Sequence, residues 1–295
     1  MKRLFDNLFE KVSRKDGPVA PRPAVACARP VAARLRAALS LVFVVMLVGG
    51  NTQSPIAQGV AQPGAQPGAQ EGSIAPGKLP SAEKVVDSYL KTIGGKKRVA
   101  AIRDATYEWQ IQLKDQMMGL AKTQTKTPSS LRTEMSFGNG QLISAATSRS
   151  AWTRGLDGKL HTLTDVEAAA ARLQAVLDAS HLIDIKKSNV LARVVSLKNL
   201  ETGPAYVVEF SLRSGARLRY LFSPTTKLLV GIEDDARKTT TRLEDYRAEG
   251  NILEPHRVSL NNGGTGELTF LLQRASYNAG ISDAVFDPPR GRQND

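Results

Sequence analysis

Residues 206–222 read YVVEFSLRSGARLRYLF. Large apolar side chains recur at every second position on both sides of Ser214-Gly215, first at Tyr206, Val208, Phe210 and Leu212, and then at Leu218, Tyr220 and Phe222. Side chains two residues apart lie on the same face of a strand, and a Ser-Gly pair accommodates the positive φ of a tight hairpin turn. The stretch therefore predicts a β-hairpin with an apolar face and a polar face, the latter carrying Arg217 and Arg219.

The same alternation returns elsewhere in the chain, at residues 107–113, 131–137, 228–232, 258–260 and 268–272. Turn-forming residues separate strand-like runs at Gly138-Asn139-Gly140, Asp157-Gly158 and Asn261 to Gly264. One-sided strands at short spacing are typical of an antiparallel sheet, because parallel strands need long crossover connections. We expect a mainly β fold of the α+β class, in which consecutive hairpins form a sheet that curls around its apolar face.

Two amphipathic helices are predicted beside this sheet. Ser81 can cap the first, which ends at Gly94-Gly95. The second follows Thr164, which has the spacing of a capping box with Glu167, and its apolar stripe ends near Ala179. Since an apolar helix face and an apolar sheet face must cover each other, we expect both helices to close the mouth of the curled sheet.

Composition divides the chain of 295 residues into segments. Residues 1–36 carry nine basic and three acidic side chains and predict a basic cytoplasmic lead. Residues 37–50 read AALSLVFVVMLVGG, an apolar run with the layout of a signal peptide or a signal anchor. Residues 51–79, rich in Pro, Gly, Gln and Ala, predict a disordered linker, and residues 80–289 hold the β domain, followed by a tail at 290–295.

This layout predicts export, with the domain either released into the periplasm or tethered to the inner membrane. The apolar run is shorter than the about 20 residues that span a bilayer, which favours cleavage. The long basic lead favours an uncleaved anchor instead. Because half of the net charge of +12 lies in that lead, the charge indicates membrane targeting, and we expect no nucleic acid as a partner. Cys27, the only cysteine, precedes the apolar run, so the domain has no disulfide.

Motifs of catalysis and cofactor binding are missing from the sequence. It has no GxSxG, HExxH, GxxxxGK[ST] or helix-opening GxGxxG, so we expect neither an enzyme nor a cofactor. The three histidines, at 161, 181 and 256, stand far apart in the sequence, and we expect no metal site. Glu233-Asp234-Asp235 is interpreted as a charged strand end that Arg237 and Lys238 balance.

Features shared with a known family occur in a fixed order along the domain. They are Tyr89-Leu90 with Gly94-Gly95, Trp109, Trp152 followed by Asp157-Gly158, the helix near 164–179, Phe222-Ser223-Pro224, Leu228-Leu229, Asp245-Tyr246, Gly250, Pro255 and Phe286-Asp287-Pro288-Pro289. In this order they resemble the outer-membrane lipoprotein carrier and lipoprotein-sorting superfamily over about 80–289. The resemblance implies an unclosed antiparallel β-barrel, with helices as a lid over a cavity that binds acyl chains.

The expected function is the binding or carrying of lipids or lipoprotein acyl chains in the cell envelope. A non-catalytic structural or protein-interaction module of the envelope is the alternative, with an envelope protein as its partner. Which one holds depends on whether the curled sheet is filled by its own side chains or left hollow. The residues expected to line a hollow cavity are Trp109, Ile111, Met135, Phe137, Trp152, Leu173, Leu177, Val208, Phe210 and Phe270.

Overall fold

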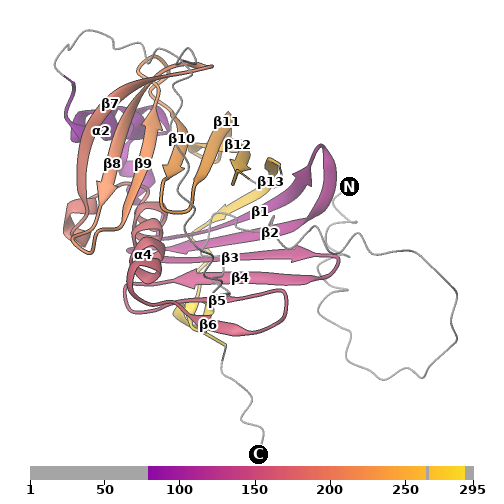
Figure 1. Ribbon diagram of the computed structural model, residues 1–295. Coiled ribbons are helices and arrows are strands. Elements are labelled where there is room, and N and C mark those ends of the chain that lie inside the picture. Colours follow the sequence, from indigo (N-terminus) through magenta and orange to yellow (C-terminus); the bar gives the residue numbers. More distant parts are fainter. Residues whose placement is uncertain (1–78, 264–265, 290–295) are drawn as a thin grey trace, which may run out of the picture. The chain divides into compact units, whose positions relative to one another are not determined.

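The computed structural model describes residues 79–263 and 266–289 (Figure 1). The predicted lead, the apolar run at 37–50, nearly all of the predicted linker and the tail at 290–295 lie outside the described residues. All described residues belong to one compact unit. Within these ranges, no helix is long and apolar enough to cross a membrane.

One antiparallel sheet contains all thirteen strands found in the described part of the chain, in the order β6-β5-β4-β3-β2-β1-β13-β12-β11-β10-β9-β8-β7. The strands are β1 (Asp104–Leu113), β2 (Gln116–Lys126), β3 (Ser130–Phe137), β4 (Gly140–Ala146), β5 (Ala151–Arg154), β6 (Leu160–Thr162), β7 (Leu191–Leu200), β8 (Gly203–Ser211), β9 (Arg217–Phe222), β10 (Leu229–Asp234), β11 (Thr239–Glu249), β12 (Ile252–Asn261) and β13 (Leu268–Tyr277). Strands β6 and β7 are its two edges, so the sheet is not closed. The predicted fold class, a curled and unclosed antiparallel sheet, is confirmed.

The hairpin predicted at 206–222 forms β8 and β9, which pair with Val208 opposite Tyr220 and Phe210 opposite Leu218. These apolar side chains are buried in the main core. The other face is less polar than the alternation predicted, because Val207 and Leu221 form a second, smaller buried cluster there. Glu209 is also buried on that face and pairs with Arg193 and Arg219.

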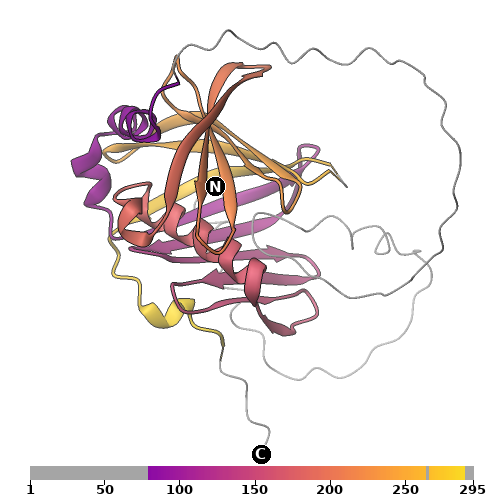
Figure 2. The same ribbon diagram turned by 60° about the vertical axis from the view of Figure 1, so that its left-hand side comes forward.

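Helix α4 (Asp165–Ser180) lies between the two halves of the curled sheet (Figures 1 and 2). Ala168, Ala171 and Ala175 pack against Leu131 and two alanines of the half formed by β1–β6. Larger residues of the helix, among them Leu173 and Leu177, join the core of the other half. The helix therefore covers the concave face, as the sequence predicted.

The start of α4 differs from the predicted capping box. Thr164 is the N-cap residue, but its side chain accepts no capping hydrogen bond. The backbone of Thr164 is extended, as is usual for an N-cap, but Asp165, the first residue of the helix, has a positive φ of 46°, so the first turn does not begin with regular helical geometry. At the other end, His181 caps the helix in the left-handed conformation with a φ of 48°.

Four shorter helical segments complete the described fold: α2 (Ala82–Thr92), α3 (Lys96–Ala100), η3 (Ile185–Ser188) and η4 (Asp283–Phe286). Ser81 caps α2 as predicted, by accepting a hydrogen bond from the backbone of Lys84. Val85, Val86 and Leu90 of this helix join the main core. Helix α2 therefore covers the apolar face next to β7–β9, where Tyr89 meets Phe222 edge to face.

Candidate functional site

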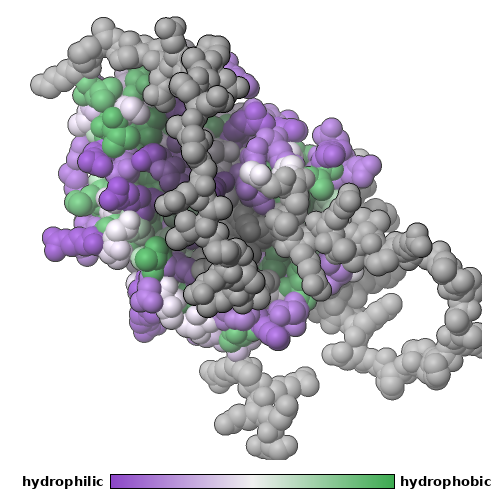
Figure 3. Space-filling view, viewed as in Figure 1, coloured by the Kyte–Doolittle hydropathy of each residue, from purple (hydrophilic) through white to green (hydrophobic). Residues whose placement is uncertain are grey.

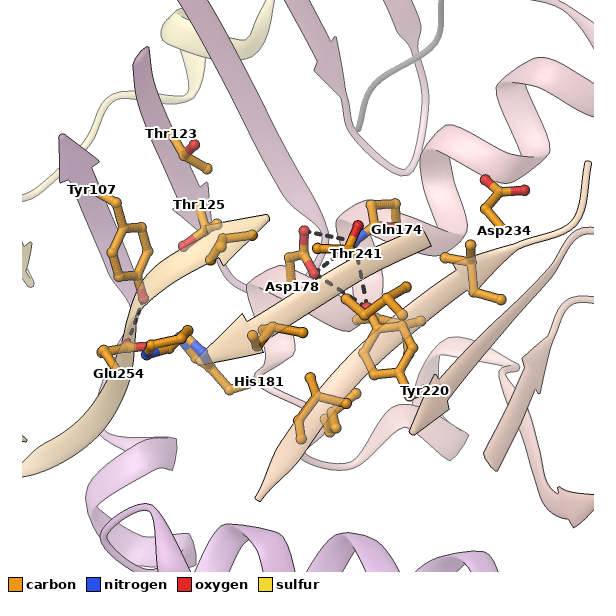
Figure 4. Close-up of a pocket in the computed structure, with 18 of the residues that line it drawn as sticks. Tyr107, Thr123, Thr125, Gln174, Asp178, His181, Tyr220, Asp234, Thr241 and Glu254 are labelled. Carbon is orange, nitrogen blue, oxygen red and sulfur yellow. Dashed lines mark hydrogen bonds between the residues drawn. The ribbon is translucent and has the colours of Figure 1, made fainter. Parts of the chain in front are cut away.

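A pocket of about 240 Å³ opens on the concave face of the sheet, beside the C-terminal half of α4 (Figure 4). Its apolar walls include Trp109 of β1, Leu177 of α4, Ile232 of β10 and Leu243 of β11. Polar side chains are interspersed among them, namely Thr123, Thr125, Gln174, Asp178, His181, Asp234, Arg237, Thr239, Thr241 and Glu254. The pocket therefore offers an apolar surface with several hydrogen-bonding groups.

Asp178 is the first carboxyl group that faces this pocket. Gln174, one helical turn earlier, donates its amide to both carboxylate oxygens at 2.9 Å. The Tyr220 hydroxyl lies 3.4 Å from Oδ1, across from the helix on β9. Burial raises the pKa of Asp178 to about 6, although these two hydrogen bonds favour the ionised form. Asp178 can therefore change its charge just below neutral pH.

Glu254 of β12 is the second carboxyl group of the pocket. The hydroxyls of Tyr107 and Tyr277 both donate to its Oε1, at 2.9 and 3.1 Å. Burial raises its pKa to about 7, and the negative charge of Glu249 adds to the shift, while the two tyrosine hydrogen bonds oppose it. Some surface of Glu254 stays accessible because the carboxyl group faces the pocket.

His181 lines the same pocket from the end of α4. Its Nε2 is buried and has no hydrogen-bond partner. Burial lowers the pKa of the imidazole to about 4, so the ring is neutral at pH 7. A buried ring nitrogen without a partner can accept a hydrogen bond from, or donate one to, a bound molecule.

The acidic run Glu233-Asp234-Asp235 is ion-paired, as a charged strand end should be. Arg237 pairs with Asp234, as predicted. Lys198 and Arg219, two partners the sequence did not indicate, pair with Glu233 and Asp235 at 2.6 Å each. In the described parts of the chain, no group of three or more His, Cys, Asp or Glu residues lies close enough to hold a metal ion.

Two of the predicted cavity residues, Trp109 and Leu177, line the pocket. Leu173, Val208 and Phe210 lie in the core next to it and are fully buried against other side chains. Four more of the predicted cavity residues belong to a separate apolar cluster, against which Trp109 also packs. They are Ile111, Met135, Phe137 and Phe270. The interior is therefore partly filled by its own side chains and partly hollow.

The prediction for Trp152 is wrong, because this residue does not lie on the concave face of the sheet but on the opposite one. Its neighbour Ala151 faces α4. Consecutive side chains of a strand point to opposite faces, so Trp152 packs with Ile143 and Ala145 on the convex side. There its Nε1 donates a hydrogen bond to the carbonyl of Phe286 at 2.9 Å. The tryptophan anchors η4 and has no place in the pocket.

Asp178, His181 and Glu254 were not predicted as residues of the pocket, although the sequence carries signals for them. Gln174, Asp178 and His181 follow one another at helical spacing along a stripe that is otherwise apolar. Glu254 has the same parity as Val258 and Leu260, whose side chains face inward. Polar residues on a predicted apolar face indicate a binding site, and these residues could have been recognised from the sequence.

No family model matches the sequence, and no curated protein matches it either. A DUF1329 family protein from Desulfovibrio piger is 12% identical, with 70% of this chain and 97% of that chain covered and a TM-score of 0.45. A domain assigned to outer membrane lipoprotein sorting, from Vibrio parahaemolyticus, is 10% identical, with 70% and 97% covered and a TM-score of 0.46.

A LolA superfamily protein from Nitrosomonas europaea is 11% identical, with 71% of this chain and 99% of that chain covered and a TM-score of 0.45. Lipoprotein-sorting folds are thus among the structural neighbours. Proteins of the superfamily that the sequence resembles are therefore among these similar structures. At this distance the likeness concerns the fold, and the role of the pocket has to be argued from its own residues.

Proposed function

We propose that this domain binds lipids or lipoprotein acyl chains in the pocket between α4 and the concave face of the sheet. The supporting observation is a pocket of about 240 Å³ with apolar walls on the concave face of the sheet. This volume is slightly below the roughly 300 Å³ at which pockets for small-molecule ligands begin. Full occupancy by a long chain requires a small outward movement of α4.

The contact between α4 and the β1–β6 half favours such a movement. Ala168, Ala171 and Ala175 carry that contact, and each contributes one methyl group. Because the free energy of apolar burial scales with the area removed from water, alanines hold the helix less firmly than leucines would. Helix α4 can therefore lift on this side while Leu173 and Leu177 stay packed on the other.

Binding of alkyl ligands of increasing length tests this proposal. The protein is titrated with alcohols from octanol to dodecanol while the fluorescence of Trp109 is followed in a Trp152→Phe background, so that only the pocket tryptophan reports. Each added methylene should contribute roughly 0.8 kcal/mol, about a fourfold gain in affinity, until the pocket is full. An affinity that does not depend on chain length would contradict an apolar binding site.

Two neighbouring residues of β11 provide a matched pair of variants. Thr241 lines the pocket, whereas Thr240 is exposed on the other face of the strand. Thr241→Phe should fill the pocket and weaken binding about tenfold or more, whereas Thr240→Phe should bind like the parent. Equal urea midpoints for the two variants would show that folding is not the cause. If Thr241→Phe binds as tightly as Thr240→Phe, the ligand lies elsewhere.

We propose further that the domain works on the outer side of the inner membrane, as a periplasmic protein. The support is the basic lead followed by the apolar run at 37–50. A reporter enzyme that is active only outside the cytoplasm, fused after Gly77, should be active. Mass spectrometry of the mature N-terminus then distinguishes a cleaved signal peptide from a retained anchor, and cytoplasmic retention would refute export.

A protein-interaction module is the second candidate function, and the free edge of β7 favours it. Leu191 and Val195 are large apolar residues that stay exposed on this edge strand, at 63% and 36%. Figure 3 shows hydrophobic surface on the same side of the molecule. An open strand edge can pair with an extended segment of an envelope protein partner.

A further inference from the structure

Three carboxyl groups line the pocket, and two of them, those of Asp178 and Glu254, are unusual because no cation in the described part of the chain neutralises them. The hydrogen bonds of Asp178 come from Gln174 and Tyr220, which are neutral. Those of Glu254 come from two tyrosines. Most other buried or half-buried acids of the domain pair with arginine or lysine, as Glu209 does with Arg193.

Among the described residues, one arginine lines the pocket, and it is already engaged. Arg237 pairs with Asp234, which is itself buried at 6% exposure. Among the described residues that line the pocket there is no lysine. The lining therefore carries more acidic than basic groups, in a chain whose overall charge is +12.

His181 adds an independent observation. Its Nε2 is buried without a partner although it lies at the wall of the pocket, and the ring is neutral. In the tautomer that carries the proton on Nδ1, Nε2 is a hydrogen-bond acceptor. A buried polar atom without a partner costs free energy, which a ligand N–H group would recover.

We propose that the pocket selects amphiphiles with a cationic amine, which Asp178, Glu254 and His181 receive while the apolar walls hold the alkyl part. This deepens the proposed lipid-binding function and rests on it. An ammonium group has three N–H donors and no acceptor, and these three side chains, which line one pocket, each offer an acceptor (Figure 4). The indole of Trp109 in the same wall offers a face on which a cation is also stabilised.

An anionic head group is disfavoured by the same arrangement. A fatty-acid carboxylate would have to lie near two side chains that are both negative at pH 8, with the arginine of the pocket already paired. Attraction by the overall charge of +12 has the opposite effect and would favour the carboxylate. A preference for the amine would therefore reflect the pocket and not the net charge.

Three ligands with the same chain length test this inference. Decylamine, decanoate and decanol are titrated into the full chain by calorimetry at pH 8, below their micellar concentrations. At this pH the two carboxyl groups are ionised and the amine is still protonated. Decylamine should bind at least about tenfold more tightly than either of the others, since hydrogen bonds between charged partners exceed neutral ones.

The possible outcomes separate the two proposals. If decanol or decanoate binds as tightly as decylamine, the amine preference is wrong while lipid binding stands. If none of the three binds, both proposals fail. A clear preference for decylamine supports both.

Variants then connect the preference to the named residues. Glu254→Gln and Asp178→Asn keep the size of the side chains and one acceptor oxygen but remove the charge. Each should lower the affinity for decylamine about tenfold and leave that for decanol unchanged, which a merely structural role of the carboxyl group would not predict. Asp87→Asn, which removes a carboxylate on the exposed face of α2, is the matched control and should bind decylamine like the parent. A uniform loss of affinity for both ligands would overturn the assignment.

Discussion

At the scale of single residues, the molecule keeps two acids where an apolar side chain would pack. Glu254 lies among the hydroxyls of Tyr107 and Tyr277, and Asp178 lies beside Gln174 and Tyr220. Burying a carboxylate without a cation costs several kcal/mol, so such groups raise their pKa instead. Their retention in a core position is better explained by binding than by stability.

This arrangement predicts a pH-dependent stability that Glu254→Gln removes. The folded pKa of Glu254, about 7, lies above its ordinary value of 4.5, so the folded state holds the proton more tightly than the unfolded state. The corresponding stability is fully present below pH 4.5 and is lost as the pH rises through 7. Relative to the parent, the Gln variant should therefore gain on the order of 2 kcal/mol between pH 4.5 and pH 8.

Urea unfolding of both proteins at several pH values measures this difference. The comparison with the parent is needed because His181 acts in the opposite direction, since its lowered pKa of about 4 makes the fold more stable as the pH rises from 4 to 6.5. Asp178, with a pKa near 6, acts in the same direction as Glu254. A constant difference between parent and variant across the pH range would show that Glu254 is not perturbed.

At the scale of elements, the strands that the sequence predicted are those whose inward side chains fill the core. Strands β8 and β9 could be predicted because their large inward side chains alternate with others: Val208, Phe210, Leu218 and Tyr220. Strand β11 was missed because two of its inward residues, Thr239 and Thr241, face the pocket and not the packed interior. A strand that borders a hollow has no need of large apolar residues, so alternation alone does not reveal it.

Strand β7 was missed for a different reason. It is an edge strand, and a bulge interrupts its pairing with β8: Val194 pairs with Val208 and Ser196 with Val207, which leaves Val195 as the extra residue. The bulge shifts the two-residue alternation by one position halfway along the strand. Bulges and polar residues are common on edges because they discourage pairing with other chains.

The bulge provides a prediction at adjacent positions. Val195→Lys, on the exposed bulge, should change stability by less than about 0.5 kcal/mol and reduce aggregation on heating, measured by light scattering. Val194→Lys, which places a charge against the main core, should destabilise by roughly 2 kcal/mol or more. If the interaction-module function holds, Val195→Lys should also abolish binding of an envelope partner. Equal destabilisation by both substitutions would mean that Val195 is not at a free edge.

At the scale of the whole sheet, the two ends of the domain meet in its centre. Strand β1 pairs with β13, from Ala105 opposite Tyr277 to Leu113 opposite Leu268. This pairing joins β1–β6 to β7–β13, and the alternation could predict the strands on both sides but not their adjacency. Hairpins follow from local turns, whereas a pairing between chain ends follows only from the folded arrangement.

The role of this central pairing gives the last prediction. A chain that ends at Asn262 lacks β13, so β1 and β12 both become free edges and Leu268, Phe270 and Leu272 leave the core. Each of these side chains contributes roughly 1.5–3 kcal/mol on burial, so their combined loss is comparable with the 5–15 kcal/mol of a typical domain. The shortened chain should therefore lack a cooperative unfolding transition in circular dichroism, whereas a chain that ends at Pro289 should unfold like the parent. A synthetic peptide of residues 267–289 should restore the transition when added, and the same peptide with Phe270→Lys should not, because the inward face of β13 supplies the stabilisation. Cooperative unfolding of the chain that ends at Asn262 would show that the two halves of the sheet are stable without their central strand.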